Sequence, residues 1–215
     1  MKERYRTIFS YGEDEIIINK SRFIGYAKPI NSEEEALEFI EEIKTKHRDA
    51  THNVYAYVFG ENSNIQRFSD DGEPSGTAGI PALEVLKKEE LRNVVVVVTR
   101  YFGGIKLGGG GLIRAYTKGA KIAVDAGTIV DMVLHRELSF QVDYSQYGKI
   151  ENFLMTNEYA TNNITFESLV NISLYISIEE LEEFKKSITD LTNGDAIIEE
   201  LDDIHLPVLD GKRIL

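Results

Sequence analysis

The residues best suited to chemistry lie between Arg100 and Lys118, where the chain reads RYFGGIKLGGGGLIRAYTK. The segment follows an apolar run and precedes a helical pattern, a position where exposed backbone amides attract anions. Its glycines allow turns and close approaches, and they are Gly103, Gly104, Gly108, Gly109, Gly110 and Gly111. Its cations suit phosphate groups, and they are Arg100, Lys106, Arg114 and Lys118. Its aromatic rings suit stacking on a base, and they are Tyr101, Phe102 and Tyr116.

The standard nucleotide-binding motifs do not match this glycine-rich segment. No glycine pair is followed by the Lys-Ser or Lys-Thr of a P-loop, and Ile113 stands where a dinucleotide fingerprint beginning at Gly108 requires glycine. A simpler explanation is that the glycines only let a helix pack closely on a strand, while the cations stay in water. The sequence leaves both explanations open.

A second candidate is the acidic loop from Ser69 to Thr77, which contains Asp70, Asp71 and Glu73. Clustered carboxylates can hold Mg²⁺ or act as acid and base. The alternative is an ordinary turn whose carboxylates pair with the basic segment, because Asp-Gly and Glu-Pro are common turn dipeptides.

The other candidate side chains give weaker signals. The histidines lack metal-ligand spacing, and they are His47, His52, His135 and His205. Ser75 and Thr77 lack the context of a nucleophile. We therefore expect no metal and no cofactor, with Mg²⁺ only if the acidic loop is catalytic.

Charge divides the chain into two parts. Residues 1–133 contain 18 Lys or Arg and 20 Asp or Glu, whereas residues 134–215 contain 6 and 16. The net charge of −12 therefore belongs mostly to the C-terminal part. Between Leu91 and Val124 the chain has six basic residues and no acidic one, so this segment is locally basic in an acidic protein.

Composition limits the class of protein. The chain has 215 residues, of which 42% are hydrophobic, enough for two modest cores. The absence of cysteine excludes disulfides, cysteine-ligated metals and thiol nucleophiles. The N-terminus has no apolar signal core, and the longest apolar run, Val94 to Val98, is too short to cross a bilayer. We expect a cytoplasmic protein of two domains.

Hydrophobic periodicity predicts the elements that position the candidate residues. In the first part we expect strands at 15–19, 21–30, 53–59 and 65–68, and helices at 32–47 and 81–91. The five valines from Val94 to Val98 predict a central strand buried on both faces. The glycine-rich segment then leads into a helix that ends near Ala126.

The second part predicts a βαββαβ order, which is the ferredoxin-like arrangement. Its strands are expected at 138–143, 163–166, 169–177 and 196–201, and its helices at 145–157 and 178–192. We assign residues 1–133 to the first domain and residues 134–205 to the second. Residues 206–215 are expected to be a tail.

Two stretches resemble the signature of the YigZ/Impact family, FSDDGEPSGTAGIPALEVL and VVVVVTRYFGGIKLGGGGLIRAYTKGA, with THNVYAY upstream. The resemblance implies an α+β protein of the two-layer α/β type. Its first domain would have the fold of the second domain of a small-subunit ribosomal protein, and its ferredoxin-like domain would be similar to the last domain of elongation factor G. The resemblance also implies a shared surface without an established catalytic role, made of Asp70, Asp71, Glu73, Arg100, Tyr101, Gly103, Gly104, Lys106, Gly108, Gly109, Gly110, Gly111 and Arg114.

Eukaryotic Impact proteins regulate translation, so the resemblance implies a translation-associated regulatory or binding protein. We expect contact with RNA, the ribosome or a translation factor through the glycine-rich segment. One alternative is an enzyme acting on a small phosphorylated ligand, with Mg²⁺ on Asp70 and Asp71. Another is a protein–protein interaction module that uses the acidic C-terminal domain. A closed pocket joining the two candidate segments would favour the enzyme, and an open basic strip with exposed Tyr101 or Tyr116 would favour RNA.

Overall fold

In the computed structural model, which describes residues 3–214, the valine run lies at the centre of a five-stranded sheet. The strand order is β2 (Gly12–Ile18), β3 (Ser21–Pro29), β6 (Val94–Tyr101), β4 (His52–Phe59) and β5 (Ile65–Ser69). Strand β6 pairs antiparallel with β3 and with β4, and its five valines are fully buried. The prediction of a central strand is confirmed.

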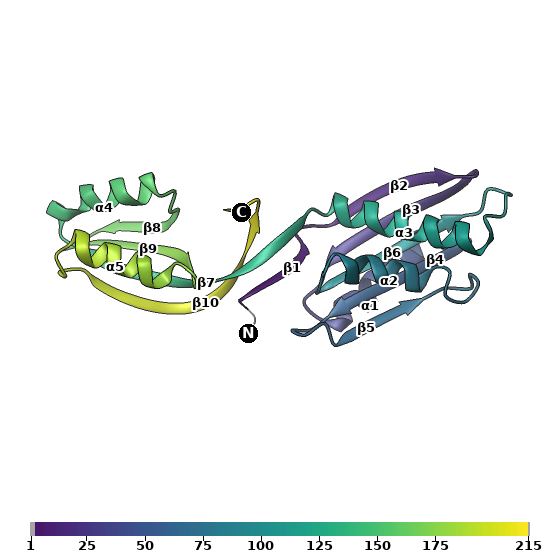
Figure 1. The fold of residues 1–215 in the computed structure, drawn as a ribbon, viewed down its shortest axis with the longest axis horizontal. Helices are drawn as coiled ribbons and strands as arrows, with labels where there is room; N and C mark the ends of the chain where they lie inside the picture. The colour runs from purple at the N-terminus through teal and green to yellow at the C-terminus, as the bar shows by residue number, and fades with distance from the viewer. Residues whose placement is uncertain (1–2, 215) are drawn as a thin grey trace. The chain divides into compact units, whose positions relative to one another are not determined.

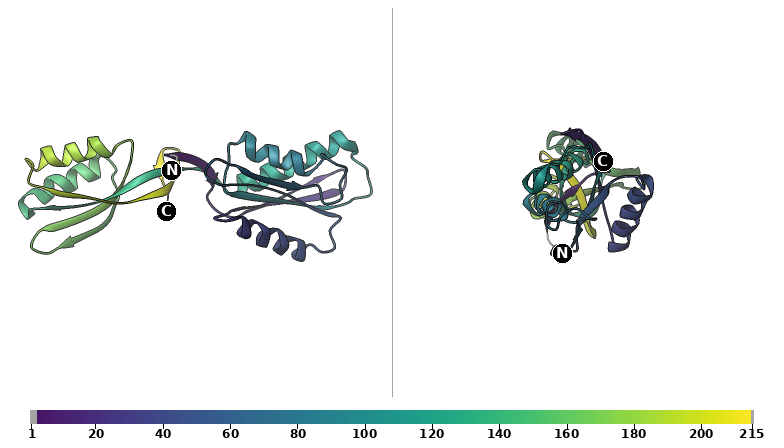
Figure 2. Two further views of the ribbon diagram at one scale, coloured as in Figure 1. Left: turned by 90° about the horizontal axis from the view of Figure 1, so that it is seen from below. Right: turned by 90° about the vertical axis from the view of Figure 1, so that its right-hand side faces the viewer.

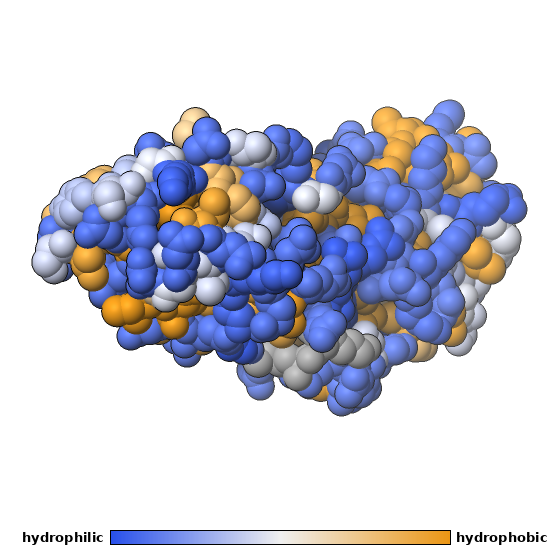
Figure 3. Space-filling view, turned by 60° about the vertical axis from the view of Figure 1, so that its left-hand side comes forward, coloured by the Kyte–Doolittle hydropathy of each residue, from blue (hydrophilic) through white to orange (hydrophobic). Residues whose placement is uncertain are grey.

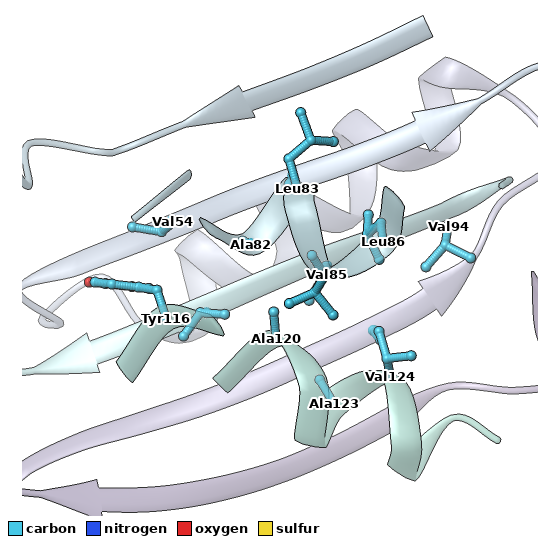
Figure 4. Close-up of a cluster of buried hydrophobic side chains, with 14 of the residues drawn as sticks. Val54, Ala82, Leu83, Val85, Leu86, Val94, Tyr116, Ala120, Ala123 and Val124 are labelled. Carbon is cyan, nitrogen blue, oxygen red and sulfur yellow. The ribbon is translucent and has the colours of Figure 1, made fainter. Parts of the chain in front are cut away.

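Helices cover both faces of this sheet (Figure 2). Helices α2 (Gly79–Lys88) and α3 (Gly108–Ala126) pack on the face that carries Val94, Val96 and Val98. Figure 4 shows how their side chains meet over the strands. Helix α1 (Glu33–Lys46) packs on the opposite face against Val95 and Val97, so it adds a third layer to the two that were expected.

Close backbone contact fixes helix α3 on the sheet. A Cβ added to Gly25 in β3 would lie 2.1 Å from the carbonyl oxygen of Gly119 in α3. A Cβ added to Gly119 would lie 2.8 Å from a methyl group of Val98. Glycine at both positions is therefore required by the packing distance between helix and sheet.

The second sheet has the strand order β10 (Ile197–Leu209), β7 (Ile129–Val142), β9 (Val170–Ser177) and β8 (Thr161–Phe166). With helices α4 (Tyr144–Thr156) and α5 (Leu181–Leu191), the chain order is βαββαβ, as expected. Helix α5 buries Leu181, Phe184 and Ile188 on one side. The α+β fold class is confirmed.

Two segments differ from the sequence prediction. Strand β1 (Arg4–Ile8), which pairs with β7, was not expected. The expectation of a tail after residue 205 is wrong, because β10 continues to Leu209 and a further strand, β11 (Lys212–Arg213), lies beside it. Asp210 and Gly211 between them have φ values of 50° and 79°, the positive angles of a tight hairpin turn.

The chain divides into two compact units (Figure 1). Within the described range, the first contains residues 3–132 and 207–212, and the second contains residues 133–206 with 213 and 214. The chain passes between the units in β7 and again in β10. No helix within residues 3–214 combines the length and the apolar character needed to cross a membrane. Hydrophobic surface in Figure 3 occurs as separate areas among hydrophilic residues.

Replacing Gly25 by alanine should lower the free energy of unfolding by about 2 kcal/mol or more, because the new methyl group overlaps the Gly119 carbonyl. Gly148→Ala is the control, since it adds the same group in α4 with nothing within 4 Å. That variant should be neutral or stabilising by up to about 1 kcal/mol. Urea unfolding measures both variants. Equal stability of the two would contradict the close packing of α3 on β3.

Candidate anion-binding surface

Asp70 of the acidic loop caps helix α2. Its Oδ1 accepts hydrogen bonds from the amides of Ala78 (3.1 Å) and Gly79 (2.8 Å), and its Oδ2 accepts one from Gly76 (2.8 Å). The N-cap residue Ala78 has no side chain for this task. A carboxylate here satisfies free amides and interacts favourably with the helix dipole. Both oxygens of Asp70 are therefore engaged inside the protein.

Asp71 ties the acidic loop to strand β4. Its Oδ2 accepts a hydrogen bond from the amide of Asn53 (2.6 Å), and Nδ1 of His52 donates to its carbonyl oxygen (2.6 Å). Asp71 and Gly72 have φ values of 45° and 87°, as in a tight turn. These contacts support the turn explanation of the loop over the magnesium site.

Glu73 joins the acidic loop to β6 and α3 through a buried ion pair. Its Oε1 lies 2.5 Å from Nη1 of Arg100 and accepts a hydrogen bond of 2.8 Å from the Tyr116 hydroxyl. The Glu73 and Arg100 side chains are only 4% and 6% exposed. Burial, followed by the charge of Glu73, raises the pKa of Tyr116, so this hydroxyl stays protonated and donates.

This ion pair changes the expected roles of two residues. Arg100 was expected to contact phosphate and Tyr116 to stack on a base, but both lie inside the protein, where Tyr116 packs between α3 and the sheet (Figure 4). Glu73 of the acidic loop is buried with them. A partner 27 positions away neutralises the arginine. Within residues 3–214, no group of three or more His, Asp or Glu side chains has a geometry that could hold a metal ion.

The start of helix α3 presents exposed backbone. Its N-cap residue is Leu107, so no side chain accepts hydrogen bonds from the first amides, which belong to Gly108, Gly109, Gly110 and Gly111. The first three of these glycines are exposed. The helix dipole adds partial positive charge at this end. Asp70 caps α2, whereas the corresponding end of α3 is left without a carboxylate.

The glycines of the segment serve different purposes. A Cβ on Gly103 would lie 2.0 Å from the Lys20 backbone, so Gly103 is needed for packing beside the β2–β3 turn. Gly104 and Gly108 have φ values of 84° and 67°, which favour glycine. For Gly109 and Gly110, the nearest atoms to an added Cβ lie at 3.9 and 3.6 Å, ordinary contact distances. Packing therefore does not explain these last two glycines.

Three of the expected cations surround this helix start. Lys106, Arg114 and Lys118 are exposed, and in the described part of the chain none of them forms an ion pair. Arg114 and Lys118 are four residues apart in α3 and share one helix face. Nη1 of Arg114 lies 3.6 Å from the Cβ position of Gly110, so its charge is next to the exposed amides.

Apolar and aromatic side chains lie on the same segment. Phe102 is 45% exposed and Tyr101 is partly exposed. Ile105 and Ile113 are each 43% exposed, and the sequence analysis missed them because single apolar residues in a glycine-rich stretch carry no periodic signal. Thr77 of the acidic loop lies 3.9 Å from the Cβ position of Gly109, so the fold brings the two candidate segments together.

Tyr101 takes part in a chain of hydrogen bonds with His47 and Tyr26. Nδ1 of His47 lies 2.8 Å from the Tyr101 hydroxyl, and Nε2 lies 2.5 Å from the Tyr26 hydroxyl. Burial, followed by the charges of Lys46 and Arg22, lowers the pKa of His47. Both ring nitrogens of His47 are therefore engaged inside the protein, and one of them holds Tyr101 in place.

Comparison with known protein families identifies both parts of the chain. Residues 19–124 match the model of the Impact N-terminal domain, and residues 140–195 match a domain of unknown function (DUF1949). The IMPACT family member YvyE of Bacillus subtilis is 48% identical over 200 residues, which cover 93% of this chain and 92% of that protein. The chain belongs to the IMPACT family.

Other members of the IMPACT family agree with this assignment. The IMPACT family member YigZ of Escherichia coli is 35% identical over 179 residues, covering 82% of this chain and 88% of YigZ. A solved structure titled as the crystal structure of a hypothetical protein is 31% identical, with a TM-score of 0.59. The matched region covers 94% of this IMPACT family chain and 99% of the chain in that structure. The family and the two-part architecture are thus shown.

The Glu73–Arg100 pair predicts a specific pattern of stability. Arg100→Met and Glu73→Leu should each lower the free energy of unfolding by about 3–5 kcal/mol, because each leaves an unpaired charge in the core. The double variant should be more stable than either single variant, since neither charge of this pair is then left buried without the other. Urea unfolding of the three variants and the wild type measures the cycle. Additive losses in the double variant would contradict this account.

The lowered pKa of His47 predicts a dependence of stability on pH. The unfolded chain, with a histidine pKa of about 6.5, binds a proton more readily than the folded protein. The contribution of His47 is therefore fully present above about pH 6.5 and is lost as the pH falls through the folded pKa. His47→Gln should have a smaller loss of stability between about pH 7.5 and 5 than the wild type. His135, whose pKa burial also lowers, remains in both proteins and cancels in the comparison. Identical pH profiles would refute the prediction.

Proposed function

We propose that this IMPACT family chain is a translation-associated binding protein that holds the phosphate backbone of single-stranded RNA on its glycine surface. The glycine surface consists of the exposed start of α3 and its cations, with the members Gly104, Lys106, Gly108, Gly109, Gly110, Arg114 and Lys118. The link to translation comes from the family resemblance to eukaryotic Impact proteins. The RNA chemistry comes from this surface.

Gly109 and Gly110 carry the proposal. They are exposed, have ordinary helical backbone angles and have room for a methyl group. Glycine lowers the stability of a helix by up to about 1 kcal/mol relative to alanine. Neither packing nor helix stability therefore favours glycine at these two positions. Bare backbone lets a phosphate oxygen approach the free amides, which gives these two residues a purpose.

The neighbouring charges support a polyanion as the partner. Lys106, Arg114 and Lys118 each have a free charge, and the stretch from Leu91 to Val124 contains no acidic residue. Phosphate contacts to such cations supply affinity without sequence preference. Phe102, 45% exposed, is the side chain best placed for stacking on a base, in place of the buried Tyr116.

The enzyme alternative needs carboxylates that are free to bind Mg²⁺, and this arrangement leaves none of the three free. Asp70, Asp71 and Glu73 accept hydrogen bonds or pair with Arg100 inside the fold, so binding of Mg²⁺ would require these contacts to break. Exposed amides and exposed cations favour the RNA proposal over the interaction module as well, because that module would use the acidic C-terminal domain and gives neither feature a role.

Fluorescence anisotropy with a short labelled oligouridylate tests the proposal. Wild-type affinity should fall steeply as salt rises from about 50 to about 200 mM. Gly109→Ala/Gly110→Ala should be at least as stable as the wild type but should bind RNA more weakly, because methyl groups obstruct the amides. Lys106→Gln/Arg114→Gln should also weaken binding and flatten the salt slope by roughly one for each lost phosphate contact.

The matched control removes two charges elsewhere. Lys149→Gln/Lys186→Gln alters exposed lysines of the second unit and should leave RNA affinity within about twofold of the wild type. Absence of RNA binding at low salt would sink the RNA proposal. Binding that the glycine variant does not weaken would show that the bare amides are not the contact. A partner protein that binds the wild type but not the glycine variant would show that this surface recognises protein in place of RNA.

A further inference from the structure

A second site candidate lies at the opposite end of strand β6 from the glycine surface. There the first unit is hollowed by an open cavity of about 650 Å³. Strand β1, the segment from Lys87 to Arg92 and parts of β4 and β5 line it. Cavities of this size accommodate small organic ligands. The glycine surface follows the last residue of β6, whereas Arg92 precedes its first, so the two sites are distinct.

The cavity is lined by more positive than negative side chains. The basic residues are Arg4, Arg6, Lys87 and Arg92, and the acidic residues are Glu90 and Asp131. The lining therefore has two more positive than negative side chains, although the whole protein has a net charge of −12. A dianion matches this surplus.

Arg92 is a buried cation with an unsatisfied donor. It is 6% exposed, and its guanidinium carbon lies 3.7 Å from the centre of the Tyr5 ring. Its Nη1 donates to the Glu61 carbonyl, whereas its Nε has no hydrogen-bond partner among residues 3–214. The buried Nε of Arg100 likewise has no partner although Arg100 pairs with Glu73, so the case for a ligand here rests on the cavity and the charge of its lining.

The backbone holds Arg92 in this position. Its amide donates to the Arg6 carbonyl (3.0 Å), and Leu91 pairs with Arg6 in a parallel bridge. The tyrosine ring on one side and the Glu61 carbonyl at one end restrict the guanidinium further. The donor is thus fixed before any ligand arrives, which lowers the entropy that binding must offset.

Two other cations at the cavity have only weak internal partners. Arg6 lies 3.8 Å from Glu89, with 38% of its side chain exposed, and Lys87 lies 2.6 Å from Glu84, with 44% exposed. Exposed pairs of this kind contribute little to stability, so both cations can exchange their partners for a ligand.

We propose that this cavity binds a small phosphomonoester, with the phosphate lying near the positive charges of Arg92, Lys87 and Arg6. The organic group lies against the apolar part of the lining, which includes the Tyr5 ring. The phosphate supplies a dianion that matches the charge of the lining. The inference does not depend on RNA binding, because the two sites share no residue.

Titration calorimetry with phenyl phosphate, inorganic phosphate and phenol tests the site. Phenyl phosphate should bind the wild type, inorganic phosphate should bind more weakly, and phenol should not bind. Arg92→Gln removes the positive charge of Arg92 from the lining, so it should weaken the binding of phenyl phosphate about tenfold or more. Because Arg92 is buried and its replacement also acts on folding, a second variant changes the exposed residue Lys87. Lys87→Gln should weaken binding several-fold.

Lys88→Gln is the matched control, because Lys88 is exposed on the same helix but does not line the cavity. It should bind phenyl phosphate as the wild type does. No binding of phenyl phosphate to the wild type at low salt would overturn the proposal. So would equal affinity in the wild type, Lys87→Gln and Lys88→Gln, because binding would then be independent of the cavity. Loss of RNA binding in the glycine variant with phenyl phosphate binding retained would separate the two sites.

Discussion

The buried ion pair between Glu73 and Arg100 is the contact on which the first unit depends. Transfer of either charge into a core costs several kcal/mol, so each is tolerated only because the other is 2.5 Å away. With the Tyr116 hydroxyl, the pair joins the acidic loop, the central strand and helix α3. It also places the loop that carries Asp70, and hence the cap of α2. The acidic loop is thus bonded to both helices.

This internal pairing determines what remains for binding. The carboxylates of the acidic loop accept hydrogen bonds from backbone amides or pair with Arg100. Arg100 is therefore buried, and the exposed cations of the glycine-rich segment are Lys106, Arg114 and Lys118. The two neighbouring helices are treated differently as a result. Asp70 accepts hydrogen bonds from the amides at the start of α2, whereas the start of α3 has no side-chain cap among residues 3–214.

Local patterns were sufficient to predict most of the fold. Five consecutive valines leave neither face of a strand suited to water, which predicts a central strand, and the apolar stripe on α5 predicts a sheet beneath it. The hairpin at Asp210 and Gly211 carried a turn signal that was missed, and the last strands were taken for a tail. The burial of Arg100 and Tyr116 could not be predicted in this way. It depends on Glu73, 27 and 43 positions away, and only the folded sheet brings these residues together.

The glycine-rich segment fitted two explanations, close packing of a helix on a strand and anion binding, because its glycines serve different purposes. Gly103 fits the packing explanation, because its missing Cβ lets the chain pass the β2–β3 turn. Gly109 and Gly110 do not, because a methyl group would fit at either place. The sequence alone does not distinguish a glycine that is needed for packing from one that is not. The distances around each glycine in the structure make that distinction. A residue that lowers helix propensity without improving packing must be favoured by something outside the fold. At an uncapped helix start flanked by unpaired cations, the group that best meets that requirement is a phosphate.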